Sequence, residues 1–342
     1  MKQAKLNQFN EREEKTYSQD WVAYNQAQTK EKLFFMHLLN DLVSFVDETE
    51  IKKKGRPSIS IQDMIFCLGI STYAGKSSRR IISDLIISKE MKYIQNKPHF
   101  NTLINYFNNS NLTQILQELI KLTALPLKQF ETQFAVDASG FGTKMYEHWY
   151  NYKYGKKEGK ERVWRKCHMM CGTNTHIITS VEVTSSTVHD SLRFKPLVEE
   201  TAKYFKMQEV SADKAYSSRD NLQAVYNNQS IPFIPFKKNV TKKPKGCFIW
   251  KQMLKLFLLH EEEFMEHYHR RSNSETVFSM IKRKFTTKLR CKKATGQDNE
   301  ILLLCLCHNI CVLIQEMFEL KINIDFNKCA NELPAQLIKY YN

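Results

Sequence analysis

Apolar residues recur at helical spacing through the first third of the chain. The pattern runs through KEKLFFMHLLNDLVSFV at 30–46, the segment at 52–75, SSRRIISDLIIS at 77–88 and NTLINYFNNSNLTQILQELIKL at 101–122. It predicts an all-α region over residues 1–130, built from short helices that polar turns connect. Such a region fits a DNA-binding domain, and it fits equally a plain helical domain with solvated cations.

From about residue 131 the pattern changes to short apolar runs that alternate with helical periods. QFAVDASG predicts a strand that ends at Asp137, and EVSADKAYSS predicts one that ends at Asp213. Further strands are predicted at 162–172, 176–186 and 231–236, and helices at 190–205 and 218–228. The alternation predicts an α/β domain with a mixed sheet over 131–320, interrupted by a basic insertion at 237–267 and followed by a tail at 321–342.

Charge narrows the range of partners. The 342 residues hold 51 Lys and Arg against 36 Asp and Glu, a formal net charge of +15. A polyanion is therefore the expected partner. A membrane surface is the competing polyanion, but no basic amphipathic helix stands out to favour it.

Export and membrane insertion are not expected. The first residues lack the apolar core of a signal peptide, and the longest apolar run, at 301–314, is too short to cross a bilayer and contains His308 and Asn309. We expect a buried core helix there and a cytoplasmic, nucleoid-associated protein. Nine cysteines, without regular paired spacing, favour buried thiols in a reducing compartment over zinc sites.

Two aspartates stand where predicted strands end. Asp137 and Asp213 would lie at the carboxyl edge of the sheet, where open α/β sheets bind ligands. Either residue alone is more often a turn former or a helix cap. Lys214 follows Asp213 directly and could reach a phosphate.

One acid, Glu275, stands among five Lys and Arg residues in YHRRSNSETVFSMIKRK at 268–284. A capping box in which Ser272 is the N-cap would explain it without any function. On a helix, however, Tyr268, Arg271, Glu275 and Lys282 share one narrow face. A carboxylate flanked by these three side chains suits metal binding beside a phosphodiester.

Together, three carboxylates from two strand ends and one helix could hold two divalent ions. Mg²⁺ prefers hard oxygen ligands, and Mn²⁺ could substitute for it. Two ions about 4 Å apart would activate a water or a 3′-hydroxyl and stabilise the leaving oxygen. The surrounding cations would offset the charge of approaching DNA.

The same residues carry a resemblance to a known family. Tyr268-x2-Arg271-x3-Glu275-x6-Lys282 resembles the Y-R-E-K signature of the DDE transposases of bacterial and archaeal insertion sequences. VDASG and SADKAYSS look like the first and second Asp motifs of that family, in the same order. The resemblance covers roughly 50–315.

The resemblance implies a ribonuclease-H-like catalytic domain in which Asp137, Asp213 and Glu275 are the catalytic and metal-binding residues. Residues implied to contact DNA near the cleaved phosphate are Tyr268, Arg271 and Lys282. STVHDS at 186–191 is also similar to a family segment; we interpret His189 and Asp190 as structural or peripheral.

Other DNA contacts are expected outside the signature. Lys242 and Lys243 belong to the basic start of the insertion, and Arg56 could enter a minor groove from its Gly-Arg-Pro turn. Some relatives hold a flipped base with an aromatic residue of the insertion, for which Trp250 is the candidate; hydrophobic packing is its alternative.

The expected function is that of an insertion-sequence transposase. It would bind the terminal inverted repeats of its element, cleave the DNA ends and transfer 3′-hydroxyls to target DNA, as a homodimer in the synaptic complex. The alternatives are a metal-dependent nuclease of the same fold and a domesticated DNA-binding protein whose metal site is idle.

Overall fold

A computed structural model describes residues 20–48, 59–143, 164–238, 240, 243, 245–330 and 339–340. The N-terminal part is helical, as predicted. Its elements are α1 (Trp21–Val43), the short strand β1 (Asp47–Glu48), α2 (Ile61–Tyr73), α3 (Ile82–Glu90), α4 (Phe100–Phe107), α5 (Ser110–Ala124) and the 3-10 helix η2 (Leu125–Phe130). Ser60 caps α2 by accepting the backbone N–H of Asp63 at 3.1 Å. The Asp63 carboxylate accepts the backbone N–H of Asn96 in turn, which fastens α2 to the loop before α4.

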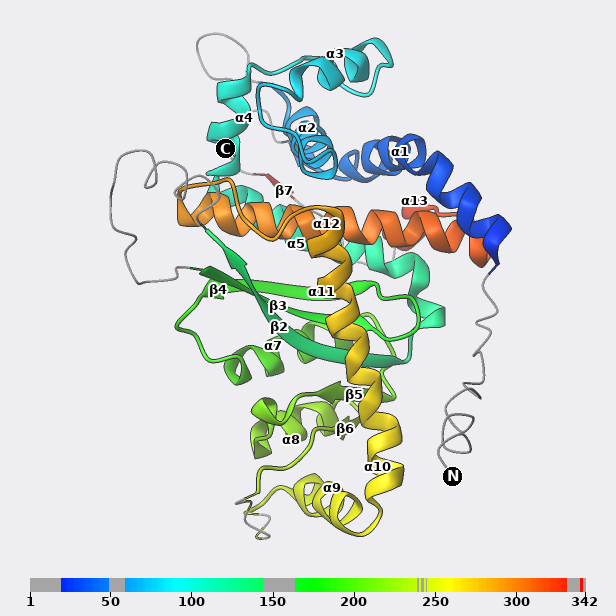
Figure 1. The fold of residues 1–342 in the computed structure, drawn as a ribbon, viewed down its shortest axis with the longest axis vertical. Helices are drawn as coiled ribbons and strands as arrows, with labels where there is room; N and C mark the ends of the chain where they lie inside the picture. The colour runs from blue at the N-terminus through cyan, green and yellow to red at the C-terminus, as the bar shows by residue number, and fades with distance from the viewer. Residues whose placement is uncertain are drawn as a thin grey trace, which may run out of the picture.

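A five-stranded mixed sheet follows, with the strand order β4-β3-β2-β5-β6 (Figure 1). Its elements in chain order are β2 (Gln133–Gly142), β3 (Trp164–Gly172), β4 (Ile178–Ser185), α7 (Ser191–Ala202), β5 (Glu209–Ala212), the 3-10 helix η3 (Lys214–Tyr216), α8 (Arg219–Asn227) and β6 (Ile231–Phe233). The first three strands are antiparallel, and β5 and β6 run parallel to β2. This arrangement confirms the predicted α/β class and agrees with the ribonuclease-H-like fold that the resemblance implies.

The first strand is longer than predicted. β2 was expected to end at Asp137, but it continues to Gly142 because β3 pairs with it along its whole length, from Phe134 with Gly172 to Gly142 with Trp164. β5 pairs with β2 only as far as Val136. Asp137 therefore marks the end of the parallel ladder and not the end of the strand.

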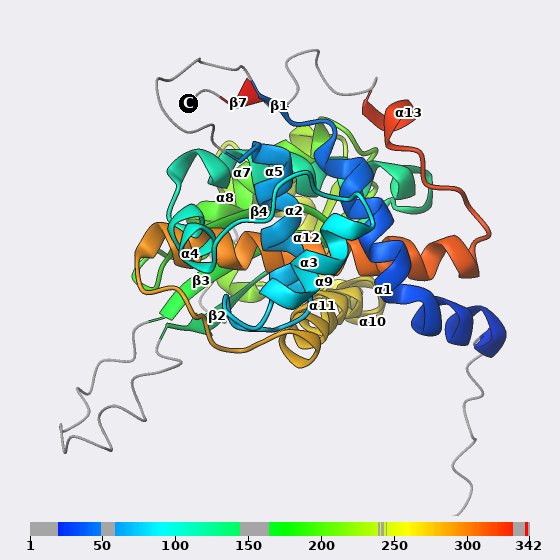
Figure 2. The ribbon, with the colours of Figure 1, turned by 90° about the horizontal axis from the view of Figure 1, so that it is seen from above.

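One long helix joins the N-terminal helices to the sheet. α12 (Ala294–Glu319) packs against α1, α2, α5 and β4, and α5 also packs against β4; Figure 2 shows α2 lying across α12. It is apolar and long enough to cross a membrane, but 78% of its most apolar window is buried inside the protein. The predicted core helix is therefore confirmed, and it is longer than the apolar run at 301–314. A single hydrophobic core extends from α1 to α13 (Phe326–Ala330).

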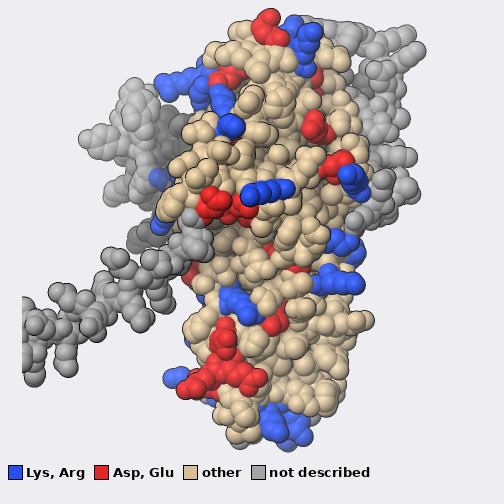
Figure 3. All heavy atoms as spheres, turned by 90° about the vertical axis from the view of Figure 1, so that its right-hand side faces the viewer, with Lys and Arg blue, Asp and Glu red and all other residues tan. Residues whose placement is uncertain are grey.

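The predicted insertion is a pair of helices, α9 (Phe248–Leu259) and α10 (Glu261–Tyr268). The ring of Phe257 packs edge-on against that of Phe264, 5.0 Å between centroids, and so holds the pair together. Figure 3 shows acidic side chains gathered at the level of α10, whose first turn carries Glu261, Glu262 and Glu263. The insertion is thus mixed in charge, with lysines at its start and on α9 and acids on α10.

Candidate active site

Asp137 and Asp213 come from neighbouring parallel strands. The ladder of β2 and β5 ends with Val136 opposite Ala212, so each aspartate is the next residue of its strand. Asp213 keeps an extended backbone, with φ −64° and ψ 156°, before η3 begins. Residues in register on parallel strands project to the same face, about 4.8 Å apart. The two predicted carboxylates therefore stand side by side.

Glu275 reaches this edge from α11 (Ser272–Lys284), which crosses in front of β2 (Figure 1). The capping-box alternative is wrong. Ser272 has helical angles, φ −56° and ψ −22°, and its hydroxyl donates to the carbonyl of His269. This is because α10, the 3-10 turn η4 (His269–Arg271) and α11 form a nearly continuous helical run, which leaves no free helix start to cap.

Arg271 joins two of the carboxylates. Its Nη1 donates to Glu275 Oε1 at 2.7 Å, and its Nη2 lies 3.3 Å from Asp137 Oδ2. Ser274 approaches the same Asp137 oxygen at 3.5 Å, while its own hydroxyl donates to the Arg271 carbonyl. One guanidinium thus ties β2 to the helix that carries Glu275.

The electrostatics of the site follow from burial. Burial raises the pKa of Asp137, and the nearby carboxylates of Glu275 and Asp213 add to the rise; the backbone N–H of Ala138 and the Arg271 guanidinium oppose it. The Asp137 side chain is 15% exposed, whereas that of Glu275 is 59% exposed. Glu275 is therefore the member of the group that has room to move.

The other residues of the signature lie along the same helical run. Tyr268 is half-buried at the end of α10, where burial raises its pKa and the three carboxylates are close enough to contribute. Lys282 donates to the Ser139 hydroxyl on β2 at 2.6 Å, and burial lowers its pKa. Lys214 is exposed in η3, directly after Asp213.

The sequence around this site is similar to that of known proteins. A profile of the transposase DDE domain matches residues 128–310, more than half of the chain. The chain belongs to the DDE transposase family. It is 22% identical over 260 residues to a probable transposase for insertion sequence element ISA1214 of Archaeoglobus fulgidus, an alignment that covers 76% of this chain and 77% of the relative. No solved structure gives a significant match. The profile and this relative support a transposase of the insertion-sequence type.

Trp250 of this transposase lies in the protein interior. The side chain is 5% exposed, its ring packs edge-on against Phe236 at 4.9 Å, and the Arg219 guanidinium lies 4.5 Å from its centroid. Its ring is covered on α9, which favours the packing alternative, and the expectation that Trp250 holds a flipped base stays a prediction. Lys243 is among the described residues and its carbonyl accepts from Arg219 at 2.8 Å, whereas Arg56 and Lys242 lie outside them.

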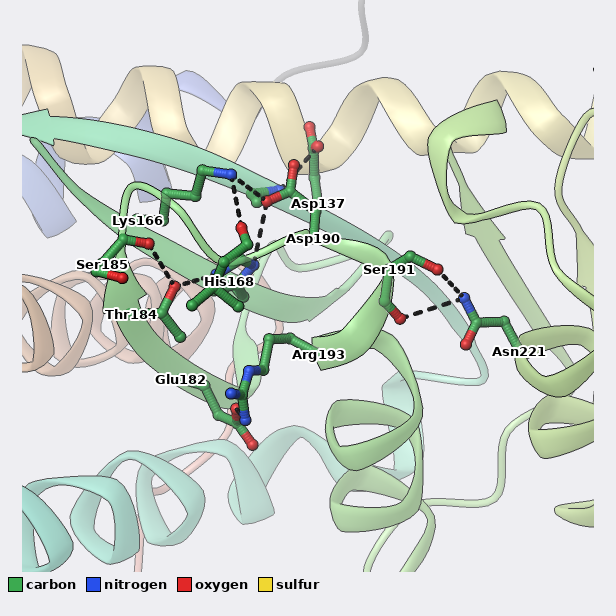
Figure 4. A network of polar contacts seen from close by, with 12 residues as sticks. Asp137, Lys166, His168, Glu182, Thr184, Ser185, Asp190, Ser191, Arg193 and Asn221 are labelled. Atoms are coloured by element: carbon green, nitrogen blue, oxygen red, sulfur yellow. Dashed lines mark hydrogen bonds and ion pairs between the residues drawn. The ribbon is translucent and has the colours of Figure 1, made fainter.

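A polar network that the sequence did not reveal lies beside Asp137 in the transposase (Figure 4). Asp190 accepts from Lys166 at 2.9 Å, and His168 bonds to Thr184 at 2.8 Å. Burial lowers the pKa of His168 to about 4, which leaves the ring neutral at pH 7. The interpretation of Asp190 as structural remains a prediction; the recurrent segment STVHDS was the only sequence signal for the network.

The donor set fits a hard divalent cation. Carboxylate oxygens are the ligands that Mg²⁺ prefers. Within the described part of the chain, no three His, Cys, Asp or Glu side chains already converge on one point, because Arg271 bridges Asp137 and Glu275. Two polar atoms close by, the Arg271 Nε and the Tyr216 hydroxyl, are buried without a hydrogen-bond partner among the described residues. They would be satisfied by oxygen atoms of a ligand or by water.

Proposed function

We propose that this transposase binds the terminal inverted repeats of its own element, cleaves the DNA at their ends and joins the 3′-hydroxyls to target DNA. The observation that supports it most is the meeting of Asp137 and Asp213, in register, with a helix that presents Glu275 and is tied to Asp137 through Arg271. This is the donor set that metal-dependent phosphoryl transfer requires.

In the proposed site, Asp137, Asp213 and Glu275 would hold two Mg²⁺ ions, for which Mn²⁺ could substitute. Bound there, the ions would supply activation of the attacking oxygen and stabilisation of the leaving oxygen. Glu275 has the exposure needed to turn from Arg271 towards the two aspartates. Arg271, released from one carboxylate, could then donate to a phosphate oxygen, as a planar guanidinium does well.

DNA would lie along the helical run that leads from Tyr268 to Lys282. The basic side chains Arg271 and Lys282 would bind the phosphodiester near the cleaved bond, and Lys214 would bind from the strand side. Because two element ends must be processed together, we propose a homodimer in the synaptic complex. The residues proposed to touch DNA each occupy a half-buried or exposed position beside the carboxylates.

The experiment is an assay of labelled element ends with Mg²⁺, in which cleavage and joining are scored separately. The proposal predicts both products. If the ends are cut but never joined, the chain is a nuclease of the same fold. If the ends are bound but neither cut nor joined, it is a DNA-binding protein with an idle site.

A further inference from the structure

A cavity of about 620 Å³ lies at the opposite end of α11 from Glu275. It opens between the turn after α2, α4, and the loop of residues 285–293 that leads from α11 to α12. Figures 1 and 2 both show this loop running from the end of α11 towards α4 and the start of α12. The volume of the cavity falls in the range of about 300–1,000 Å³ that is usual for small-ligand sites.

The rim of the cavity is cationic. The lining includes five basic residues, Lys76, Arg79, Arg290, Lys292 and Lys293, and one acid, Glu300. The Glu300 carboxylate is already engaged by the backbone N–H groups of Arg290 and Cys291, at 2.9 and 3.0 Å. The rim therefore favours an anion.

The cations of the rim differ in their freedom. Lys76 pairs with Asp84 at 2.6 Å, and Arg290 donates to the carbonyls of Gly75 and Lys76, so these two side chains hold the rim in shape. Lys292 and Lys293 are exposed, and within the described part of the chain neither ammonium group forms a hydrogen bond or ion pair. Lys293 also precedes the first turn of the 26-residue α12, with no side chain capping that turn. A helix start of this kind adds positive potential.

The floor of the cavity is apolar. Phe107, Phe285, Ile104 and Leu304 line it, and Ile104 is 45% exposed. A cavity lined by both apolar side chains and cations matches a ligand that has a flat apolar part and a negative charge. A nucleotide has this chemistry, because its base can stack on the floor while its phosphate stays on the rim.

We propose that this cavity holds one nucleotide of the DNA strand that the transposase binds. The choice of a strand over a free nucleotide rests on continuity with the proposed active site. Phe285 directly follows α11, ten residues after Glu275, which places it about 15 Å further along the helix axis. Lys282 of α11 lies between them in the chain, so a cation stands between the carboxylates and the cavity.

The end of β2 fixes the position of the cavity relative to the carboxylates. Leu289 donates its N–H to the carbonyl of Gly142 at 2.7 Å, and Gly142 donates to the carbonyl of Thr287 at 3.2 Å. The loop is thus bonded to the strand that carries Asp137. The proposal rests on the proposed function only in taking DNA as the ligand.

The test measures binding of a short labelled single strand of mixed sequence by fluorescence anisotropy, in EDTA, over a range of salt concentrations. The rim variant is Lys292→Ala with Lys293→Ala. The matched control is Lys251→Ala with Lys255→Ala, two exposed lysines of α9 at the other end of the protein. We expect the rim variant to lose about tenfold in affinity, with a salt slope smaller by about 1.4 for a single strand, while the control keeps the wild-type values.

The floor is tested with strands that carry one abasic position, moved along the sequence. An abasic site at one position of the strand should weaken its binding to the wild-type protein. In the Ile104→Glu variant, an abasic site at that position should have no further effect on affinity. A flat abasic scan, or a rim variant with the wild-type affinity and salt slope, would overturn the proposal. So would tight binding of a free deoxynucleoside monophosphate that does not displace the strand, since the cavity would then be a free-nucleotide site.

Because these measurements contain no divalent ion, they are independent of cleavage. Loss of binding in the rim variant of a protein that never cuts DNA would support the cavity while the proposed function fails. Normal cutting with an unchanged rim variant would leave the proposed function intact and exclude the cavity.

Discussion

Asp137 and Asp213 stand in register on two parallel strands, one residue past the last pair of the ladder that joins them. The ladder of β2 and β5 therefore fixes the backbone from which each carboxylate projects. The third acid, Glu275, is 59% exposed on a helix and is held at present by Arg271. The proposed site therefore combines a fixed pair of ligands with one that can move.

Glu275→Gln should remove DNA cleavage and leave the fold intact. Glu275 caps no helix, its side chain is 59% exposed, and the glutamine amide oxygen can still accept from Arg271, so the free energy of unfolding should change by less than about 0.5 kcal/mol. Cleavage should fall more than about 100-fold if Glu275 is the metal ligand that we propose. Chemical denaturation and an end-cleavage assay measure the two effects, with the exposed Glu262→Gln as control. A variant that cuts at the normal rate would remove Glu275 from the site.

Arg271→Ala should move the acidic limb of the pH–rate profile for cleavage to higher pH. The guanidinium lowers the pKa of Asp137 against the effect of burial, so without it the carboxylate takes up a proton at a higher pH. Rates at saturating DNA across a pH series measure the shift. Arg270→Ala is the matched control, since Arg270 bonds to Glu209 at 2.6 Å and not to Asp137. An unchanged pH profile would show that Arg271 does not tune Asp137.

Lys282→Ala should weaken DNA binding uniformly across sequences. If its ammonium group contacts a phosphate, the slope of log affinity against log salt should decrease by about 1. Ser139→Ala serves as control, because it removes the hydroxyl that Lys282 contacts but keeps the cation. Equal slopes for Lys282→Ala and the wild type would place Lys282 away from DNA.

Asp137→Asn should be at least as stable as the wild type at neutral pH, although it is inactive. Burial raises the pKa of Asp137 in the fold, so the folded protein binds more protons than the unfolded chain between the two pKa values. The stability of the wild type therefore falls as pH rises through that window, and the ionised carboxylate remains costly above it. Asparagine avoids this cost.

Thermal unfolding in EDTA at neutral and acidic pH measures the effect. The gain in stability of Asp137→Asn over the wild type should vanish at a pH below the ordinary pKa of aspartate, about 3.9. Asp220→Asn, at an exposed acid of α8, should show no such pattern. A less stable Asp137→Asn protein at neutral pH would contradict this electrostatic account.

Local sequence patterns were sufficient to predict where Asp137 and Asp213 lie in the fold, since each follows an apolar run that forms a strand. They were insufficient for the length of β2, because its extension depends on pairing with β3, which begins 22 residues after β2 ends (Gly142 to Trp164). The parallel ladder alone would have ended the strand at the predicted residue.

Ser272 and Glu275 have the spacing of a capping box but do not form one. Their spacing satisfies a capping box, yet the chain before Ser272 is already helical, so no start exists for them to cap. The flanking residues, not the motif, decide between the two conformations. The burial of Trp250 likewise depends on Phe236 and Arg219, which lie outside its own segment, so that segment alone could not decide between packing and a DNA contact.

The cationic cavity was not predictable from any single stretch. Its rim combines Lys76 and Arg79 with residues more than 200 positions later, which meet because α12 packs beneath α2 and α4. Arg290, bonded to the carbonyl of Gly75, is the contact that brings them together.

The most direct test of the central claim counts Mn²⁺ ions bound to the transposase on DNA, by electron paramagnetic resonance. The account predicts about two ions per chain for the wild type, and fewer for each of Asp137→Asn, Asp213→Asn and Glu275→Gln. If all three variants bind as many ions as the wild type, these carboxylates do not form the metal site and the account fails.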